Sequence, residues 1–486
     1  MKQIFYLIFP VLFAACGYTI PEGRLIDADP PITPDYLNIT IPPNIAPLYF
    51  ALTDSIKEAY AIFTAKSRIV TVKSQNGQFK ISEKKWRDLL QNSIGQKISV
   101  KITLINNCKE ILQYRPFELQ VTEEKIDPYI AYRLIEPGYE LWNKMGIYQR
   151  NLENFKQTPI FENRLTNGNC MNCHSFCMQN PEKMLFHLRA KFPGTILING
   201  KNVEKLNTKT PETISNLVYP SWHPSGRYVA FSVNTTKQGF HSNDANRIEV
   251  YDEASDVVVY DVENHEIISN SLIFSENSFE TFPTFSPDGK TLYFCSAKAL
   301  PMPNSFKDVH YSLCSIAFDP ENRNFGSSVD TLYNAETECK SVSFPRVSPN
   351  GRFLIFTLSS YGNFSIWHKD ANLYIIDLQT NEIKPMIAIN SEDVESYHSW
   401  SSNSHWLVFS SRRIDGLYTR PFIAYINEHG EASKPFLLPQ NDVKYYDRLM
   451  KSFNIPEFVK GKVEVNMSKI ASIAKKDKGT DLKFVE

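Results

Sequence analysis

The chain has 486 residues, 42% of them hydrophobic and 22% charged, a composition typical of an ordinary globular protein with more than one domain. Its formal net charge of -1 excludes the strongly basic balance of nucleic-acid-binding proteins, so we expect no nucleic acid as a partner. The 24 tyrosines, 32 phenylalanines and 29 prolines favour a mainly β fold with many turns.

Residues 1–15 have the pattern of an export signal. Lys2 precedes an apolar run over 4–15, and this run is too short to span a bilayer comfortably. The run ends in LFAAC, which resembles a bacterial lipobox and implies cleavage before Cys16 and acylation of its thiol. An ordinary secretory signal is the alternative. We expect an exported chain, lipid-anchored on the periplasmic side of a bacterial membrane, with the outer membrane favoured.

Two segments precede the middle of the chain. Residues 16–47 contain seven prolines, which predicts a stiff, extended stalk. Residues 48–125 predict a small β-sandwich-like domain. Asn76-Gly77 lies between two alternating stretches and indicates a hairpin. Residues 82–95 have apolar positions at helical spacing, so this domain is expected to contain one helix.

Residues 126–184 are rich in aromatics and have few alternating stretches, so we expect short helices and loops there. They contain Cys170-Met171-Asn172-Cys173-His174, the C-x-x-C-H spacing that attaches a c-type haem. In that interpretation Cys170 and Cys173 form thioethers, and His174 is an axial iron ligand. A structural disulfide or a zinc site is the alternative, although a second pair of zinc ligands is missing from the sequence.

The second axial ligand stays open at this point. His187 and Met145 are the leading candidates, and an open or water-bound iron is also possible. Arg133, Arg150 and Arg164 could pair with haem propionates, or they could be ordinary surface arginines.

From about residue 185 the chain repeats itself. PSWHPSGRYVAFS, PTFSPDGKTLYFC, PRVSPNGRFLIFT and HSWSSNSHWLVFS begin at residues 220, 283, 345 and 398 and align without gaps. Each has a turn followed by an alternating strand, as expected for the four-stranded blades of a β-propeller. We expect a propeller of five to seven blades over 185–463 and a disordered tail over 464–486.

These repeats resemble the TolB-type propeller, whose signature is P-x-x-S-P-D-G-x-x-L-x-F. Together with the lipobox, the proline-rich segment and CMNCHSF, they resemble a family of exported Bacteroidetes lipoproteins described as TolB-like or cytochrome c-type. The resemblance implies a covalent haem c, with its iron, at Cys170, Cys173 and His174. It implies no known reaction.

Three functions follow from these patterns. The first is electron transfer through one haem, with the propeller as a docking scaffold. The second is a non-redox propeller that binds a protein or glycan partner, with a structural or sensory haem. The third is an enzyme, but the sequence has no G-x-S-x-G nucleophile elbow, so a hydrolase is disfavoured. The expected partners are the membrane, through Cys16, and a protein on the propeller.

Overall fold

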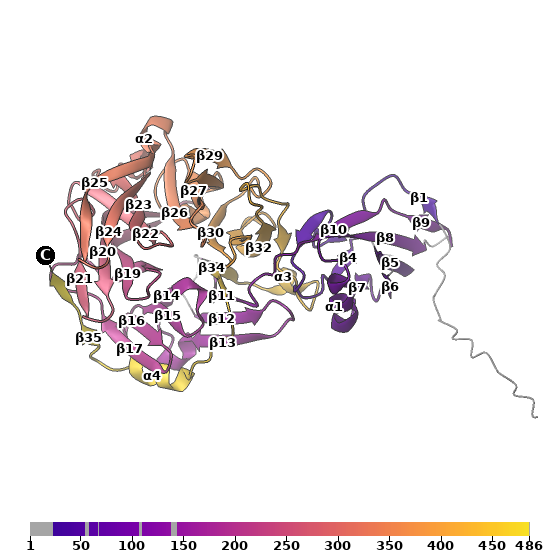
Figure 1. Cartoon of the computed structure of the whole chain (residues 1–486), viewed down its shortest axis with the longest axis horizontal. Helices are drawn as coiled ribbons and strands as arrows, with labels where there is room; N and C mark the ends of the chain where they lie inside the picture. Colours follow the sequence, from indigo (N-terminus) through magenta and orange to yellow (C-terminus); the bar gives the residue numbers. More distant parts are fainter. Residues whose placement is uncertain (1–22, 54–57, 67, 106–108, 138–142, 486) are drawn as a thin grey trace, which may run out of the picture.

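The computed structural model describes residues 23–53, 58–66, 68–105, 109–137 and 143–485, and this part of the chain is mainly β, as the sequence predicts. An N-terminal β domain lies beside a larger body in which several sheets surround a common axis (Figure 1). The proposed lipid-attachment residue Cys16 and the signal segment lie outside the described residues.

The N-terminal domain has two sheets. The larger contains β1 (Arg24–Leu25), β3 (Ile39–Ile41), β5 (Glu58–Ala65), β6 (Arg68–Lys73), β8 (Lys97–Ile105), β9 (Ile111–Gln113) and β10 (Phe117–Val121). The smaller contains β2 (Ile32–Thr33), β4 (Phe50–Leu52) and β7 (Gln78–Phe79). The turn before β7 has positive φ at Asn76 and Gly77, as a tight Asn-Gly turn requires, and one bridge joins Gln75 and Gln78 across it. The expected hairpin does not extend further, because β6 pairs with β5 and β7 pairs with β4 in the other sheet.

Helix α1 (Glu83–Gln91) covers this domain and begins where the sequence predicts. The Ser82 side chain accepts a hydrogen bond from the Lys85 backbone N–H and caps the helix. Trp86, Leu89 and Leu90 are buried, because their spacing places them on one face of the helix.

The proline-rich segment differs from the expected stalk where it is described. It supplies β1, β2 and β3, and Ile39, Ile41 and Ile45 are buried in the domain core. The prolines favour an extended backbone, as expected. The segment does not form a separate stalk, because the isoleucines between the prolines pack against the sheets of the domain.

Six antiparallel sheets of the described chain surround the axis, and we call them ring sheets I to VI (Figure 1). Sheet I contains β34 (Ser452–Val459), β11 (Tyr129–Ile135), β12 (Gly146–Asn151) and β13 (Gln157–Glu162). Sheet II contains β14 (Met171–Phe176), β15 (Lys183–Leu188), β16 (Gly194–Asn199) and β17 (Asn202–Asn207). Sheet III contains β18 (Leu217–Trp222), β19 (Tyr228–Phe240), β20 (Ile248–Asp261) and β21 (Glu266–Ile268).

The other three ring sheets follow in chain order. Sheet IV contains β22 (Ser278–Phe285), β23 (Thr291–Lys298), β24 (Ser312–Asp319) and β25 (Asn324–Tyr333). Sheet V contains β26 (Ser341–Val347), β27 (Phe353–Ser359), β28 (Asn372–Asp377) and β29 (Glu382–Pro385). Sheet VI contains β30 (Glu395–Trp400), β31 (Trp406–Ser411), β32 (Arg420–Tyr425) and β33 (Phe436–Leu437).

The strands nearest the axis, which we call the inner strands, are β34, β14, β18, β22, β26 and β30. Each inner strand contacts the next one, and β34 contacts both β30 and β14. Sheet I therefore combines a strand from the C-terminal part of the chain with three strands from residues 129–162. This pairing brings the two ends of the ring together.

The expected haem segment of short helices and loops is not present. Residues 129–135, 146–151, 157–162 and 171–176 are strands of sheets I and II, and the helical part consists of short 3-10 turns at Asn163–Thr166 and Cys177–Gln179. Alternation is weak in these strands because they are buried on both faces; Ile130, Ala131 and Tyr132, three in a row, are each fully buried.

The C-terminal segment also differs from the expected disordered tail. After α4 (Met467–Ala474), β35 (Thr480–Asp481) pairs in parallel with β17, and β36 (Lys483–Val485) pairs in parallel with β21. We call β35 and β36 the strap, because they cross the outer edges of sheets II and III (Figure 1).

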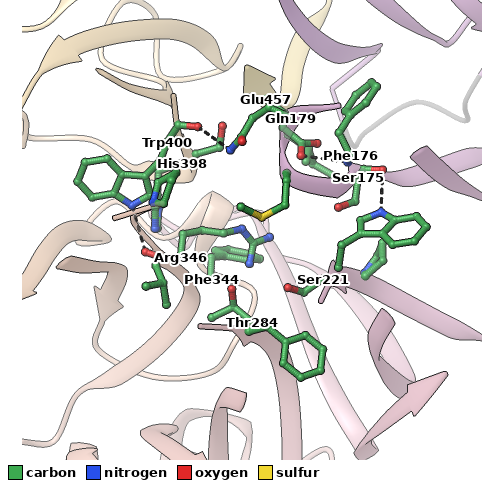
Figure 2. A pocket seen from close by; sticks show the side chains of 18 of the residues that line it. Ser175, Phe176, Gln179, Ser221, Thr284, Phe344, Arg346, His398, Trp400 and Glu457 are labelled. Carbon is green, nitrogen blue, oxygen red and sulfur yellow. Dashed lines mark hydrogen bonds between the residues drawn. The ribbon is translucent and has the colours of Figure 1, made fainter. Parts of the chain in front are cut away.

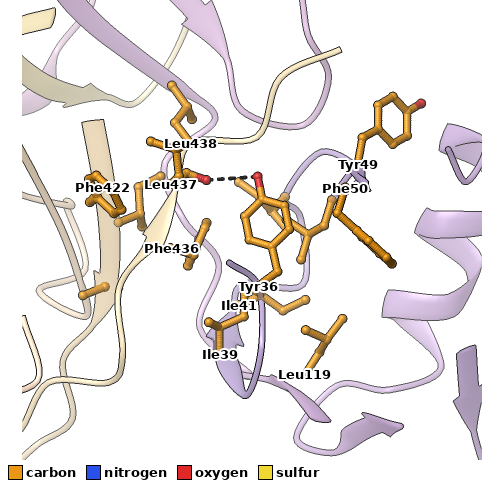
Figure 3. Packing of buried hydrophobic residues seen from close by; sticks show 14 of the residues in the cluster. Tyr36, Ile39, Ile41, Tyr49, Phe50, Leu119, Phe422, Phe436, Leu437 and Leu438 are labelled. Atoms are coloured by element: carbon orange, nitrogen blue, oxygen red, sulfur yellow. Dashed lines mark hydrogen bonds between the residues drawn. The ribbon is translucent and has the colours of Figure 1, made fainter. Parts of the chain in front are cut away.

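The N-terminal domain packs against sheet VI. One hydrophobic cluster includes residues of both, and the Tyr36 hydroxyl donates to the Leu437 carbonyl at 3.3 Å (Figure 3). The Asp127 carboxylate accepts hydrogen bonds from the Ser402 backbone N–H and hydroxyl at 2.7 and 2.6 Å. Within the described residues, no helix has the length and apolarity needed to cross a membrane.

Candidate binding pocket on the axis

Each inner strand bends at an equivalent residue. Six residues have positive φ values of 46–53°, and the pairing register shifts next to each of them: Cys173, Tyr219, Phe282, Phe344, Tyr397 and Ile455. These are β-bulges, which leave extra residues unpaired and turn the strand. The next residue is a proline in four strands and a histidine in two. Proline has no backbone N–H to donate to a neighbouring strand, and a bulge is a place in a sheet where it is tolerated.

The bulges align six four-residue segments, which are CHSF, YPSW, FPTF, FPRV, YHSW and IPEF. The third position of each segment lines one pocket: Ser175, Ser221, Thr284, Arg346, Ser399 and Glu457. We call these the axial ring. Four of its members have hydroxyl side chains, one is a guanidinium and one is a carboxyl. Figure 2 labels Ser175, Ser221, Thr284, Arg346 and Glu457.

The pocket has a volume of about 140 Å³ and lies at the end of the ring where each inner strand turns into the next strand. Pro224, Pro287 and Pro349 of these turns form its rim. The turns brace one another, because His223 Nε2 lies 3.1 Å from the Gly289 carbonyl of the next sheet. The predicted turns of the repeats therefore frame the site.

Arg346 and Glu457 carry the charge in this pocket. Among the described residues that line it, Arg346 is the only arginine or lysine and Glu457 the only acid. No ion pair joins them in the described part of the chain, and Arg346 Nη1 donates to the Pro345 carbonyl at 2.9 Å. The guanidinium extends toward the middle of the pocket (Figure 2).

Glu457 is held in a poorly solvated position. Its Oε1 accepts a hydrogen bond from the Phe176 backbone N–H at 3.0 Å. Burial raises the pKa of Glu457 to about 8, against the opposing effects of that hydrogen bond and of Arg346. The carboxyl is therefore mostly protonated at neutral pH and is a hydrogen-bond donor there.

Other polar atoms at the pocket have no protein partner. Ser399 Oγ and Gln179 Oε1 are buried without a hydrogen bond within the described structure. The Gln179 amide nitrogen faces the Trp400 carbonyl at 3.4 Å, which leaves its oxygen toward the pocket (Figure 2). Buried polar groups normally find partners, so a ligand or water is expected to complete these bonds.

Two histidines lie at the pocket, and both are neutral. Burial lowers the pKa of His398 and of His174 to about 3. His398 Nε2 lies 2.9 Å from the Ile355 carbonyl, whereas neither ring nitrogen of His174 has a hydrogen bond of normal geometry.

The haem interpretation of C-x-x-C-H is wrong. Cys170 and Cys173 are free and only 8% and 4% exposed, and His174 is 2% exposed. Cys170 packs in a hydrophobic cluster with Met145 and Phe186, whereas Cys173 forms the bulge of an inner strand. A porphyrin bonded to both sulfurs would have to displace packed side chains on two sides of β14. In the described residues no three His, Cys, Asp or Glu side chains are grouped to hold a metal ion.

The structure does not bring the candidate second ligands to His174. His187 is buried in β15, where its Nδ1 lies 3.2 Å from Thr195 Oγ1. Met145 Sδ accepts a hydrogen bond from the Met171 backbone N–H at 3.2 Å.

The three arginines considered for propionates have protein partners instead. Arg133 Nη1 donates to the Met171 carbonyl at 3.2 Å, and Arg164 Nε donates to Glu162 at 2.7 Å. Arg150 Nη1 donates to Gln440 Oε1 at 2.6 Å.

Sequence reasoning overlooked the axial ring, although a signal was present. His174-Ser175-Phe176 matches the start of the fourth repeat, His398-Ser399-Trp400, almost exactly in residue type. A short insertion after Phe176 hides this match from a gapless alignment with the repeats. Without the match, the sequence indicated a haem-binding motif at this segment.

Comparisons with known proteins show likeness in structure alone. No protein-family model and no curated protein matches the chain. It is similar to the crystal structure of the tricorn protease, with a TM-score of 0.34 and 11% identity over 82% of this chain and 48% of that one. It is similar to prolyl oligopeptidase B from Galerina marginata, with a TM-score of 0.35 and 11% identity over 63% of this chain and 44% of that one.

A third similar structure is dipeptidyl peptidase 4 from Porphyromonas gingivalis, with a TM-score of 0.25 and 10% identity over 72% of this chain and 59% of that one. The chain spans less than two thirds of the length of each of these proteins. The burial of Cys170, Cys173 and His174 among packed strands corrects the expectation of a covalent haem c with its iron, and with it the expected cytochrome c-type family and electron transfer.

Proposed function

We propose that ring sheets I to VI are the six blades of a TolB-type β-propeller. The order of inner-strand contacts supports this, as does the pairing of β34 with β11, which joins the two ends of the ring. The repeat turns at Gly226, Gly289 and Gly351 all have φ values of 72–75°, as expected for equivalent positions in successive blades.

The propeller acts, in this proposal, as a non-catalytic binding module whose axial pocket holds a segment of a partner protein. The observation that carries it is the axial ring, in which six equivalent positions direct polar groups to one place. Most of the lining is apolar or aromatic, with a few polar atoms that lack partners, which is typical of a ligand site.

The volume of the pocket limits what enters it. A cavity of about 140 Å³ accepts a chain end or one side chain, and the rest of a partner would rest on the rim. Such a shape favours a protein whose exposed segment reaches the axis.

The module is proposed to work outside the cytoplasm, anchored at Cys16 to the periplasmic face of a bacterial membrane. The lipobox-like LFAAC supports this. Mass spectrometry of the mature chain tests it: an acylated Cys16 at the N-terminus is expected, and a chain that retains residues 1–15 would contradict it.

Site-specific cross-linking tests the binding module. The photo-reactive residue p-benzoylphenylalanine replaces Pro224 on the rim, and in a matched control it replaces Leu272, which is 40% exposed before β22 at the opposite end of the blades. In cells that make the protein naturally, we expect a protein adduct from position 224 and none from position 272. The same adducts from both positions, or none from either, would contradict the proposal.

A further inference from the structure

We propose that the axial pocket binds a carboxylate, and specifically the C-terminal carboxylate of the partner segment. This inference rests on the proposed function and names the chemical group that the pocket recognises.

The first step is the uncompensated charge of Arg346. Its guanidinium points into the pocket without an ion pair in the described structure, and its one bond there is to the carbonyl of its own neighbour, Pro345. A guanidinium in a poorly solvated place is costly unless an anion accompanies it. Its planar fork of N–H donors fits a carboxylate with two parallel hydrogen bonds.

The second step is that Glu457 does not supply this anion. The residue sits on β34, the adjacent β14 gives it an N–H from Phe176, and Arg346 on β26 is the cation that affects it. Cys177, after β14, is the other titratable group close enough to interact with it, and burial raises the pKa of that thiol. His174 and His398 are neutral, so at neutral pH the pocket has a net positive charge.

The third step is the supply of hydrogen-bond donors around the guanidinium. Ser175, Ser221, Thr284 and Ser399 can each donate through a hydroxyl, and protonated Glu457 adds another donor. Ser399 Oγ has no partner among the described residues. Hydroxyl groups can rotate to donate, so these side chains around one guanidinium can all donate to an acceptor-only ligand, which a carboxylate is.

The fourth step is the route into the pocket. The site lies on the axis and is reached past Pro224, Pro287 and Pro349. A chain end can enter along this axis. A carboxylate in the middle of a segment would have to carry the flanking backbone over the prolines on both sides. Capture of a terminal carboxylate by converging donors is a known mode of peptide recognition.

Titration calorimetry on the intact protein tests the inference with three probes: N-acetyl-trialanine as the free acid, the same peptide as the C-terminal amide, and acetate. We expect the free acid to bind at least ten-fold more tightly than the amide at pH 7. Acetate is expected to bind at least ten-fold more weakly than the peptide acid. Equal binding of acid and amide would overturn the carboxylate, and acetate as tight as the peptide would overturn the chain terminus.

Variants assign the effect to Arg346. Arg346→Gln should remove the preference for the free acid, and Arg346→Lys should keep part of it, because the charge remains while the fork is lost. The matched control is Arg352→Gln, which removes an arginine of the same sheet that pairs with Asp377 outside the pocket and should leave the preference unchanged. A preference that survives in Arg346→Gln would contradict the assignment.

Glu457 gives an independent readout. Affinity for the free acid should fall at least five-fold between pH 7 and pH 9.5 in the natural protein, because the ionised carboxyl then repels the ligand. Glu457→Gln should abolish that fall, and an unchanged fall would count against this arrangement. If cross-linking from position 224 succeeds while acid and amide bind alike, the binding module stands and only the carboxylate fails.

Discussion

Cys173 adopts a backbone conformation that most residues avoid. Its φ is 51°, and five other inner-strand residues, which include Tyr219 and Phe344, have nearly the same value. A non-glycine residue in this region costs about 1 kcal/mol or more, so the surrounding sheets must hold each bulge in place. Cys173 and His174 therefore occupy the same two positions of a bulge as Tyr397 and His398 do in β30.

The first prediction concerns the two cysteines. In Cys170→Ala/Cys173→Ala the protein should fold and keep its binding, with the free energy of unfolding lowered by about 1–2 kcal/mol per site, as for small buried side chains. Chemical denaturation and a visible absorption spectrum measure this. An intense porphyrin band in the natural protein that disappears in the double variant would contradict it.

The second prediction concerns His174. Its pKa is about 3 when folded and near 6.5 when unfolded, so the unfolded chain binds the extra proton and stability falls as the pH drops from about 6.5 toward 3. His174→Pro installs the residue found at four of the six equivalent positions. It should reduce the loss of stability between pH 7 and pH 5. Denaturation curves at both pH values decide this, and an equal loss in the variant would contradict it.

At the scale of elements, the features that could be predicted are those that depend on a few neighbouring residues. The turns at Gly226, Gly289 and Gly351, the tight turn at Asn76-Gly77 and helix α1 all depend on local sequence, and each forms where it was expected. The mainly β class follows from the same signals. The hairpin expected around Asn76-Gly77 does not form, because β6 pairs with β5 and β7 pairs with β4.

The pairing of strands that are far apart in the sequence could not be predicted. Nothing local in IPEF indicates that β34 pairs with β11, more than 300 residues earlier in the chain. Because that pairing brings β34 between β30 and β14, it also places Glu457 in the pocket that Ser221 and Arg346 line. The haem interpretation failed for the same reason: C-x-x-C-H was judged by spacing, whereas the ring decides what those side chains contact.

The third prediction concerns the strap. β35 and β36 cover the outer edges of β17 and β21, and between them Leu482 is buried in a hydrophobic cluster. Leu482→Asp should release the strap and lower the free energy of unfolding by about 2–4 kcal/mol, because a buried leucine is lost and a charge is placed there. Thermal unfolding measures this loss, with Lys483→Asp, an exposed neighbour, as the control. Equal melting temperatures for the two variants would contradict it.

At the scale of the whole molecule, the N-terminal domain and the ring share one hydrophobic cluster. The Tyr36 hydroxyl donates a hydrogen bond to the Leu437 carbonyl across the contact (Figure 3). Asp127 accepts two more from Ser402. The domain therefore belongs to the same folded body as sheet VI, and it lies to the side of the ring of sheets (Figure 1).

The fourth prediction follows from this contact. The natural protein should unfold in one calorimetric transition. Asp127→Ala leaves the Ser402 donors without their acceptor and should destabilise the protein by about 1–3 kcal/mol or split the transition in two. Asp88→Ala, on the exposed face of α1, is the control. Two separate transitions in the natural protein would show that the domains fold independently.

Cross-linking with a blocked pocket tests the central claim most directly. Ser221→Trp fills the axial ring without changing the rim, and p-benzoylphenylalanine at position 224 reports on the partner in the same chain. The proposal predicts that the protein adduct formed from position 224 disappears when Ser221 is tryptophan and stays when the exposed control Leu272 is tryptophan. An adduct that persists with the pocket filled would contradict binding on the axis.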